Sequence, residues 1–121
     1  MSSRPEELRD RTKKFALRII RLFRSLPFKT DTQVLGKQLL RCGTSVAANY
    51  RAVCRARSKA EFIARMGIVA EEADESVLWL ELLIDSGVLE QDKASKLLNE
   101  ARELTAIFTA SQQTSKKGSK L

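Results

Sequence analysis

The sequence predicts an all-α protein, an antiparallel up-down-up-down four-helix bundle. Gly and Pro are scarce, with five and two copies in 121 residues, and this favours long helices. Apolar residues recur every three or four positions in four segments, the spacing of one helix face, and no segment alternates with the period of a strand. Short connections at 26–30, 57–58 and 87–91 require each helix to fold back on the one before it.

The first helix is expected to follow Ser3 and to end at the sequence SLPFKT. Pro5 suits the first turn, because the N–H that Pro lacks would have no partner there. Leu26 precedes Pro27, which disfavours helical backbone, so the helix should stop at this point. Its apolar stripe consists of Leu8, Phe15, Ile19, Leu22 and Phe23.

The second helix is expected to begin at TDTQ, where Thr30 and Gln33 fit a capping box, and to end at the turn formed by Arg57 and Ser58. Gly43 inside it costs about 1 kcal/mol relative to Ala. Such a glycine marks either the close approach of another backbone or plain tolerance. The apolar stripe consists of Leu35, Leu39, Cys42, Val46, Tyr50 and Val53.

The third helix is expected to begin at SKAE, where Ser58 and Glu61 form a second capping box, and to end before Gly87. Two adjacent heptad stripes give it a broad apolar face. Trp79 and Leu82 extend a further line of the helix, which is either the core of a wide bundle or an oligomer interface, where Trp is enriched. The stripes are Phe62, Met66, Val69, Ala73, Ser76, Leu80 and Leu83, beside Ile63, Ala70, Val77 and Ile84.

The fourth helix is expected from about Asp92 to Ala110, with apolar residues again three and four apart. The polar, lysine-rich end of the chain predicts a disordered basic tail over 113–121. The domain organisation is therefore one four-helix bundle over 1–112 followed by that tail.

Composition argues against catalysis. Histidine is absent, which removes the commonest general base and transition-metal ligand, and no phosphate loop, zinc pattern or nucleophile elbow is found. We expect no enzymatic activity, cofactor or metal.

No apolar run approaches the roughly 20 residues of a membrane span and no secretory signal is visible, so a cytoplasmic location without membrane contact is expected. Cys42 and Cys54 are expected to be two buried free thiols.

Charge is divided unevenly along the chain. Residues 1–65 hold sixteen Lys and Arg against five Asp and Glu, whereas residues 66–115 hold three against ten. The bundle topology places a dense basic cluster at one pole, which favours a polyanionic partner, a neighbouring acidic helix or simple solvation. This cluster comprises Arg4, Arg9, Arg11, Lys13, Lys14, Arg51, Arg55, Arg57, Lys59, Arg65, Lys116, Lys117 and Lys120.

The fold-back at residues 57–58 also predicts which residues face each other, since their numbers should sum to about 115 or 116. Arg41 then faces Asp74 and Glu75 and has acidic partners available within the chain. Arg51 faces Arg65, so these two cations cannot neutralise each other. Tyr50 and Trp79 are the aromatic candidates for base stacking outside the core Phe residues.

Residues 39–89 resemble the bacterial four helix bundle protein family, also called the large-subunit ribosomal RNA intervening-sequence protein family. The resemblance implies an antiparallel four-helix bundle that assembles into a homopentameric ring. A related member, the accessory variability determinant of diversity-generating retroelements, is a basic pentamer that binds nucleic acid and a reverse transcriptase, and the latter partner is suggested here by analogy alone. The matching residues are Ser45, Asn49, Tyr50, Arg51, Ala52, Arg55, Ser58, Glu61, Phe62, Glu72, Glu75, Trp79 and Leu82.

We therefore expect a non-enzymatic oligomeric adaptor that binds RNA or DNA. The predicted phosphate-contacting residues are Arg51, Arg55, Arg57, Lys59 and Arg65, and the predicted interface residues are Arg41, Glu72, Glu75, Trp79 and Leu82. A protein-interaction scaffold without a nucleic-acid role, which uses its charges between subunits, is the alternative. A metal enzyme with Glu72 and Glu75 as ligands is a third hypothesis, disfavoured by the absence of His.

Overall fold

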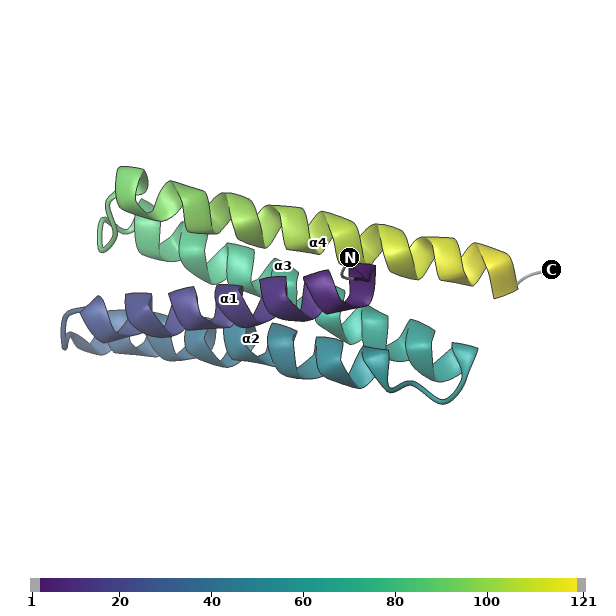
Figure 1. Ribbon diagram of the computed structural model, residues 1–121. Helices are drawn as coiled ribbons and strands as arrows, with labels where there is room; N and C mark the ends of the chain where they lie inside the picture. The colour runs from purple at the N-terminus through teal and green to yellow at the C-terminus, as the bar shows by residue number, and fades with distance from the viewer. Residues whose placement is uncertain (1–2, 120–121) are drawn as a thin grey trace.

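The computed structural model describes residues 3–119, which form four helices and contain no strand. The helices are α1 (Arg4–Ser25), α2 (Thr30–Cys54), α3 (Lys59–Asp85) and α4 (Gln91–Ser119), and they lie lengthwise beside one another (Figure 1). The predicted all-α, four-helix class is confirmed. Among these four helices, none contains an apolar stretch long enough to cross a membrane.

Each helix packs along the one that precedes it in the sequence. In each neighbouring pair, later residues of one helix meet earlier residues of the next, as the colours of Figure 1 also show. The contacts that show this are Ile19 with Gly43 and Leu26 with Gly36 between α1 and α2, Arg41 with Glu72 between α2 and α3, and Ile63 with Gln112 and Glu81 with Arg102 between α3 and α4.

One apolar core runs between the helices and draws on all four. Its largest fully buried members include Phe15, Leu39, Leu80 and Phe108. The buried hydroxyls of Thr12 and Ser76 donate to carbonyls one turn earlier in their own helices, at 2.9 Å each, and that of Thr32 donates to Asp31 Oδ1 at 3.4 Å.

Of the two predicted capping boxes, the one at Ser58 is found in part, since the Glu61 side chain accepts from the Arg57 N–H and not from the Ser58 N–H. Ser3 and Ser58 are the N-caps of α1 and α3, and each side chain accepts from the backbone N–H three residues later. The capping box predicted at Thr30 is wrong, because Lys29 is the N-cap of α2 and makes no side-chain cap bond. Thr30 already has helical backbone, and the Gln33 side chain donates to Pro27 O instead.

The helix ends differ in how well they were predicted. α3 ends at Asp85 with Ser86 as its C-cap, and the φ of +85° at Gly87 is the left-handed conformation of a C′ glycine. α4, in contrast, continues past the predicted end at Ala110, and the tail expected to be disordered is helical over 113–119, while 120–121 lie outside the described residues. Gln112 Nε2 donates to Ile63 O at 3.1 Å and holds this extension against α3.

Candidate nucleic-acid interface

Two arginines lie above a floor of small side chains, Arg51 in the last turn of α2 and Arg55 at its C-cap. Arg51 and Arg55 lie one helical turn apart, with Ala47, Ala48 and Ala52 between and beside them. Small side chains leave room for a ligand to approach the helix backbone closely, while the longer arginines on either side supply charge. A shallow surface of this kind suits an extended polyanion.

Two grooves flank this part of α2 and share Ala48, Arg51 and Arg55. The α1–α2 groove, of about 530 Å³, is lined by Arg9, Asp10, Lys13, Thr44, Ala47, Ala48, Arg51 and Arg55. The α2–α3 groove, of about 640 Å³, is lined by Ala48, Arg51, Ala52, Arg55, Arg57, Glu61 and Arg65. The two grooves form one continuous basic surface, because the shared arginines stand between them.

The structure brings four of the five predicted phosphate-contacting residues into one groove. Arg51, Arg55, Arg57 and Arg65 all line the α2–α3 groove, as the predicted facing of Arg51 and Arg65 requires. Lys59 does not line it. The α3 N-terminus places Lys59 on the other side of the α2–α3 turn, where it lines a separate hollow between the helix ends.

The groove cations differ in whether they are already neutralised. Arg65 Nε lies 3.0 Å from Glu61 Oε1, and Glu61 Oε2 also accepts from the Arg57 backbone N–H at 3.1 Å. These hydrogen bonds hold the pKa of Glu61 below its usual value. Within residues 3–119, the guanidinium groups of Arg51, Arg55 and Arg57 make no ion pair.

Helix α1 contributes cations to the surface that the sequence-based site did not include. Arg9 and Lys13 join Arg51 and Arg55 in the α1–α2 groove, with Asp10 as the acidic residue beside them. Arg11 belongs elsewhere, because it points toward α4 and binds Glu100 and Glu103 at 2.7 Å each. The one-turn spacing of Arg9 and Lys13 is the sequence signal that could have assigned them to this groove.

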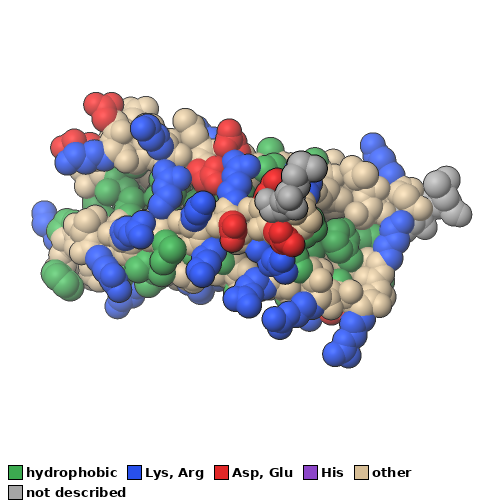
Figure 2. All heavy atoms as spheres, in the orientation of Figure 1, with side chains coloured by type: hydrophobic (Ala, Val, Ile, Leu, Met, Phe, Trp, Pro, Cys, Tyr) green, Lys and Arg blue, Asp and Glu red, His purple; other side chains and the backbone are tan. Residues whose placement is uncertain are grey.

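The basic surface also extends beyond the pole at which it was expected. Helix α1 holds eight Lys and Arg against three Asp and Glu, whereas α3 holds two against seven. Figure 2 shows Lys and Arg side chains spread along the face over α1 and α2. The molecule is therefore divided lengthwise into a basic α1–α2 side and an acidic α3.

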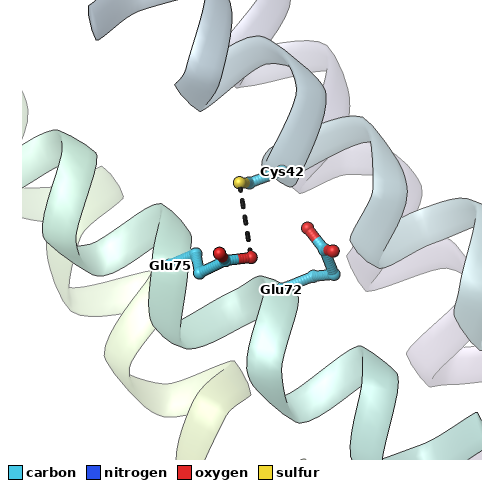
Figure 3. A group of neighbouring side chains, drawn as sticks. All are labelled: Cys42, Glu72 and Glu75. Atoms are coloured by element: carbon cyan, nitrogen blue, oxygen red, sulfur yellow. Dashed lines mark hydrogen bonds between the residues drawn. The ribbon is translucent and has the colours of Figure 1, made fainter.

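Arg41, Glu72 and Glu75, three of the predicted interface residues, lie together with Cys42 between α2 and α3. Arg41 Nη1 lies 3.5 Å from Glu72 Oε2, and Arg41 Nη2 lies 3.2 Å from Cys42 Sγ. The Cys42 thiol in turn donates to Glu75 Oε2 at 3.8 Å (Figure 3). Arg41 was predicted to face Asp74 and Glu75, but it pairs with Glu72, which lies two and three residues before them on α3.

The same cluster could be considered as a metal centre, since the Sγ of Cys42 and carboxylate oxygens of Glu72 and Glu75 lie within 4.8 Å of one another (Figure 3). One feature disfavours this, because the Arg41 cation already supplies positive charge beside Glu72. Burial raises the pKa of the metal-free Cys42 thiol to about 11, so a metal would have to displace its proton on binding.

Trp79 and Leu82, the remaining predicted interface residues, lie toward the acidic end of α3. Trp79 is half-buried against the core, and its indole Nε1 is buried without a hydrogen-bond partner among the described residues. Leu82 is 38% exposed, and the same helix exposes Ile68 and Leu78. α3 therefore combines exposed apolar side chains with exposed carboxylates.

Comparison with known proteins identifies a family and solved structures that this chain resembles. The family described as 23S rRNA-intervening sequence protein matches residues 6–110. A crystal structure of a protein of unknown function from the S23 ribosomal protein family of Bacteroides thetaiotaomicron is 32% identical. The two structures superpose with a TM-score of 0.83, and the match covers 92% of this chain and 99% of the Bacteroides chain. No curated protein matches the chain.

Proposed function

The chain belongs to the 23S rRNA-intervening sequence protein family, and from that premise we propose that it is a non-enzymatic adaptor that binds RNA or DNA. The site is the continuous basic surface formed by the α1–α2 and α2–α3 grooves. The observation that carries the proposal is the set of arginines at Arg51, Arg55 and Arg57, whose guanidinium groups lack carboxylate partners within residues 3–119.

Physical chemistry favours a phosphate backbone as the ligand of this surface. Arginine presents a planar fork of donors that matches phosphate oxygens, and each phosphate that it neutralises releases counterions. Contacts to phosphate oxygens carry no direct sequence information, so binding of phosphates by these arginines tolerates different sequences. The expected activity is therefore salt-dependent binding with little sequence preference.

We further propose that the helices form an antiparallel up-down-up-down bundle and that five copies assemble into a ring. The family resemblance supports the pentamer, and the exposed apolar residues of α3 supply a face that a neighbouring subunit would cover. Assembly would place several copies of the basic surface on one particle. The linked sites would then bind a long polyanion more tightly than one subunit could, without any new contact.

A second candidate function is a protein-interaction scaffold with no nucleic-acid role. The observation that favours it is the lengthwise division of charge, because the basic α1–α2 side of one subunit complements the acidic α3 of another. In this case Arg51 would meet carboxylates of a neighbouring subunit and would not be available to phosphate.

The test of the proposed function is a fluorescence-anisotropy titration of labelled RNA and DNA. Changing Arg51, Arg55 and Arg57 to Ala should weaken binding of every sequence at least tenfold at low salt. The matched control changes Lys29, Lys93 and Lys96 to Ala, since these three exposed lysines lie at the opposite end of the bundle. Unchanged affinity in the triple-Ala variant would refute the proposal.

An Arg51→Glu variant distinguishes the nucleic-acid adaptor from the protein-interaction scaffold. Its assembly state is measured by size-exclusion chromatography with light scattering. If Arg51 contacts phosphate, the variant keeps the mass of the wild-type assembly and loses nucleic-acid binding. If Arg51 lies at a subunit interface, the variant dissociates.

A further inference from the structure

A hollow lies where the ends of the four helices converge, next to the basic grooves. This pole hollow has a volume of about 550 Å³, within the range of about 300–1,000 Å³ typical of small-molecule sites. It is lined by Pro5, Arg9, Tyr50, Val53, Cys54, Ala56, Ser58, Lys59, Phe62 and Ser115. Helix α1 begins short of this end of the bundle, whereas α4 extends beyond it (Figure 1).

The pole hollow has a mixed lining whose apolar part includes the rings of Tyr50 and Phe62. Tyr50 and Val53 are almost fully buried, at 4% and 3% exposure, so the half-buried Phe62 ring is the aromatic face open to a ligand. The Tyr50 ring lies 5.3 Å from the Phe108 ring in a tilted contact, which fixes its position. Phe62 also lines an adjacent groove on the α4 side, so its ring is accessible from two hollows.

Cations and hydroxyls lie beside this apolar part of the lining. Arg9 and Lys59 line the hollow and, within residues 3–119, neither makes an ion pair. Burial, and to a smaller extent the neighbouring Cys54, raises the pKa of Tyr50 to about 12. A tyrosine hydroxyl is protonated at neutral pH in any case and can donate a hydrogen bond. Ser115 supplies a further hydroxyl from α4.

The pole hollow is continuous with the proposed phosphate surface. Arg9 lines both the pole hollow and the α1–α2 groove. Arg55 lines both grooves, while the residues on either side of it, Cys54 and Ala56, line the hollow. A strand whose phosphates lie along Arg51 and Arg55 therefore passes the mouth of the hollow beside Arg9.

We infer that the pole hollow accepts an unpaired base of a single-stranded nucleic acid, with the neighbouring phosphates bound by Arg9 and Lys59. This inference rests on the proposed function and specifies its preferred ligand. The apolar, aromatic part of the lining matches the face of a base, the cations match its phosphates, and the hydroxyls of Tyr50 and Ser115 can bond its edges. A duplex keeps its bases stacked and paired, so it can use the grooves but not the hollow.

The test fills the hollow without deleting core residues. Ser115→Trp places a large side chain in the hollow from the surface of α4, and Gln113→Trp is the matched control at an exposed position that lines none of the hollows described. Anisotropy titrations use a labelled single-stranded oligonucleotide, its duplex and a single strand of abasic residues. The abasic strand keeps the phosphates and needs no variant protein.

We expect Ser115→Trp to weaken single-strand binding about tenfold, the scale of losing one stacked base, and to leave duplex binding within about twofold. Gln113→Trp should change neither. The wild type should bind the abasic strand about as weakly as Ser115→Trp binds the normal strand. Equal wild-type affinity for the normal and abasic strands, or no effect of Ser115→Trp, would overturn the inference while leaving the grooves in place. Failure to bind any of the three probes would instead overturn the proposed function.

Discussion

Cys42 and Cys54 are about three turns apart on α2 but lie in different environments. Cys42 is fully buried and bonded to Arg41 and Glu75, as expected of a core thiol. Cys54 is exposed, so the expectation of two buried thiols is wrong for it. Cys42 belongs to the apolar stripe of α2. At the end of the helix it is Val53 that continues this stripe, and Cys54, the next and last residue of α2, therefore points away from the core.

This difference predicts unequal thiol reactivity. In the native protein at about pH 8, Ellman's reagent should modify one thiol quickly, and Cys54→Ser should abolish that phase. Cys42 should react only in denaturant, because burial both shields it and raises its pKa to about 11. Two thiols that react at the same rate in the native protein would contradict this assignment.

At the scale of elements, α1 and α2 approach each other closely at Gly43. A Cβ at this position would lie 2.8 Å from Ile19 Cγ1 and 3.0 Å from Cγ2. Of the two meanings the sequence left open for this glycine, close approach is the one observed, although the neighbour is a side chain and not a backbone. Ile19 cannot yield easily, since a β-branched residue has one preferred rotamer in a helix.

Gly43→Ala should therefore lower the free energy of unfolding by about 1–3 kcal/mol, even though Ala is the better helix former by about 1 kcal/mol. Urea denaturation followed by circular dichroism measures the change. Gly118→Ala is the control, because its Cβ would meet only the far end of the flexible Lys59 side chain, and its effect should be smaller. Stabilisation by Gly43→Ala would show that the two helices can move apart at little cost.

Helices α1 and α4 are joined by the ion pairs of Arg11 with Glu100 and Glu103. The Glu100 side chain is only 16% exposed and accepts two hydrogen bonds from Arg11, at 2.7 and 2.8 Å. Hydrogen bonding to Arg11 holds the pKa of Glu100 below its usual value. The carboxylate therefore stabilises the fold above its unfolded pKa, and this contribution is lost as the pH falls through the lower folded pKa.

Glu100→Gln should cost about 1–2 kcal/mol of unfolding free energy at about pH 7, and the difference from wild type should shrink toward about pH 3. Urea denaturation at the two pH values measures it. Glu90→Gln is the control, since Glu90 is 75% exposed in a long contact with Lys93 and should change stability by less than about 0.5 kcal/mol. A Glu100→Gln deficit that is independent of pH would contradict the ionic role of this carboxylate.

How far these elements could be predicted depends on whether their determinants are local. Ser58 and Gly87 act through hydrogen bonds or dihedral angles within a few residues, so the sequence predicts both helix ends. The helical extension over 113–119 depends on Gln112 reaching Ile63, 49 residues away, which local composition cannot show.

At the scale of the whole molecule, the grouping of Arg51, Arg55, Arg57 and Arg65 was predictable because a short turn fixes which residues of α2 and α3 face each other. The match weakens with distance from that turn, and so Arg41 pairs with Glu72, two and three residues before its expected partners. The predicted basic pole groups Arg9 and Lys13 with Arg51 and Arg55, but membership of that pole could not show which of its cations line the same groove.

The proposed assembly makes its own prediction at this scale. Leu82→Glu places a carboxylate in the apolar part of the α3 face and should dissociate the oligomer in light scattering. Leu17→Glu is the control, since Leu17 on α1 is exposed to nearly the same extent, 40% against 38%. An oligomer that survives Leu82→Glu but not Leu17→Glu would place the interface on α1 and not on α3.

Phosphate binding by the basic grooves is tested most directly by the salt dependence of nucleic-acid affinity. For the wild type, the logarithm of the association constant should fall linearly with the logarithm of the salt concentration, by roughly 0.7–0.9 per phosphate contacted. Changing Arg51, Arg55 and Arg57 to Gln should make that slope shallower by about 2–3 units. The same slope in wild type and variant would contradict phosphate binding at these arginines.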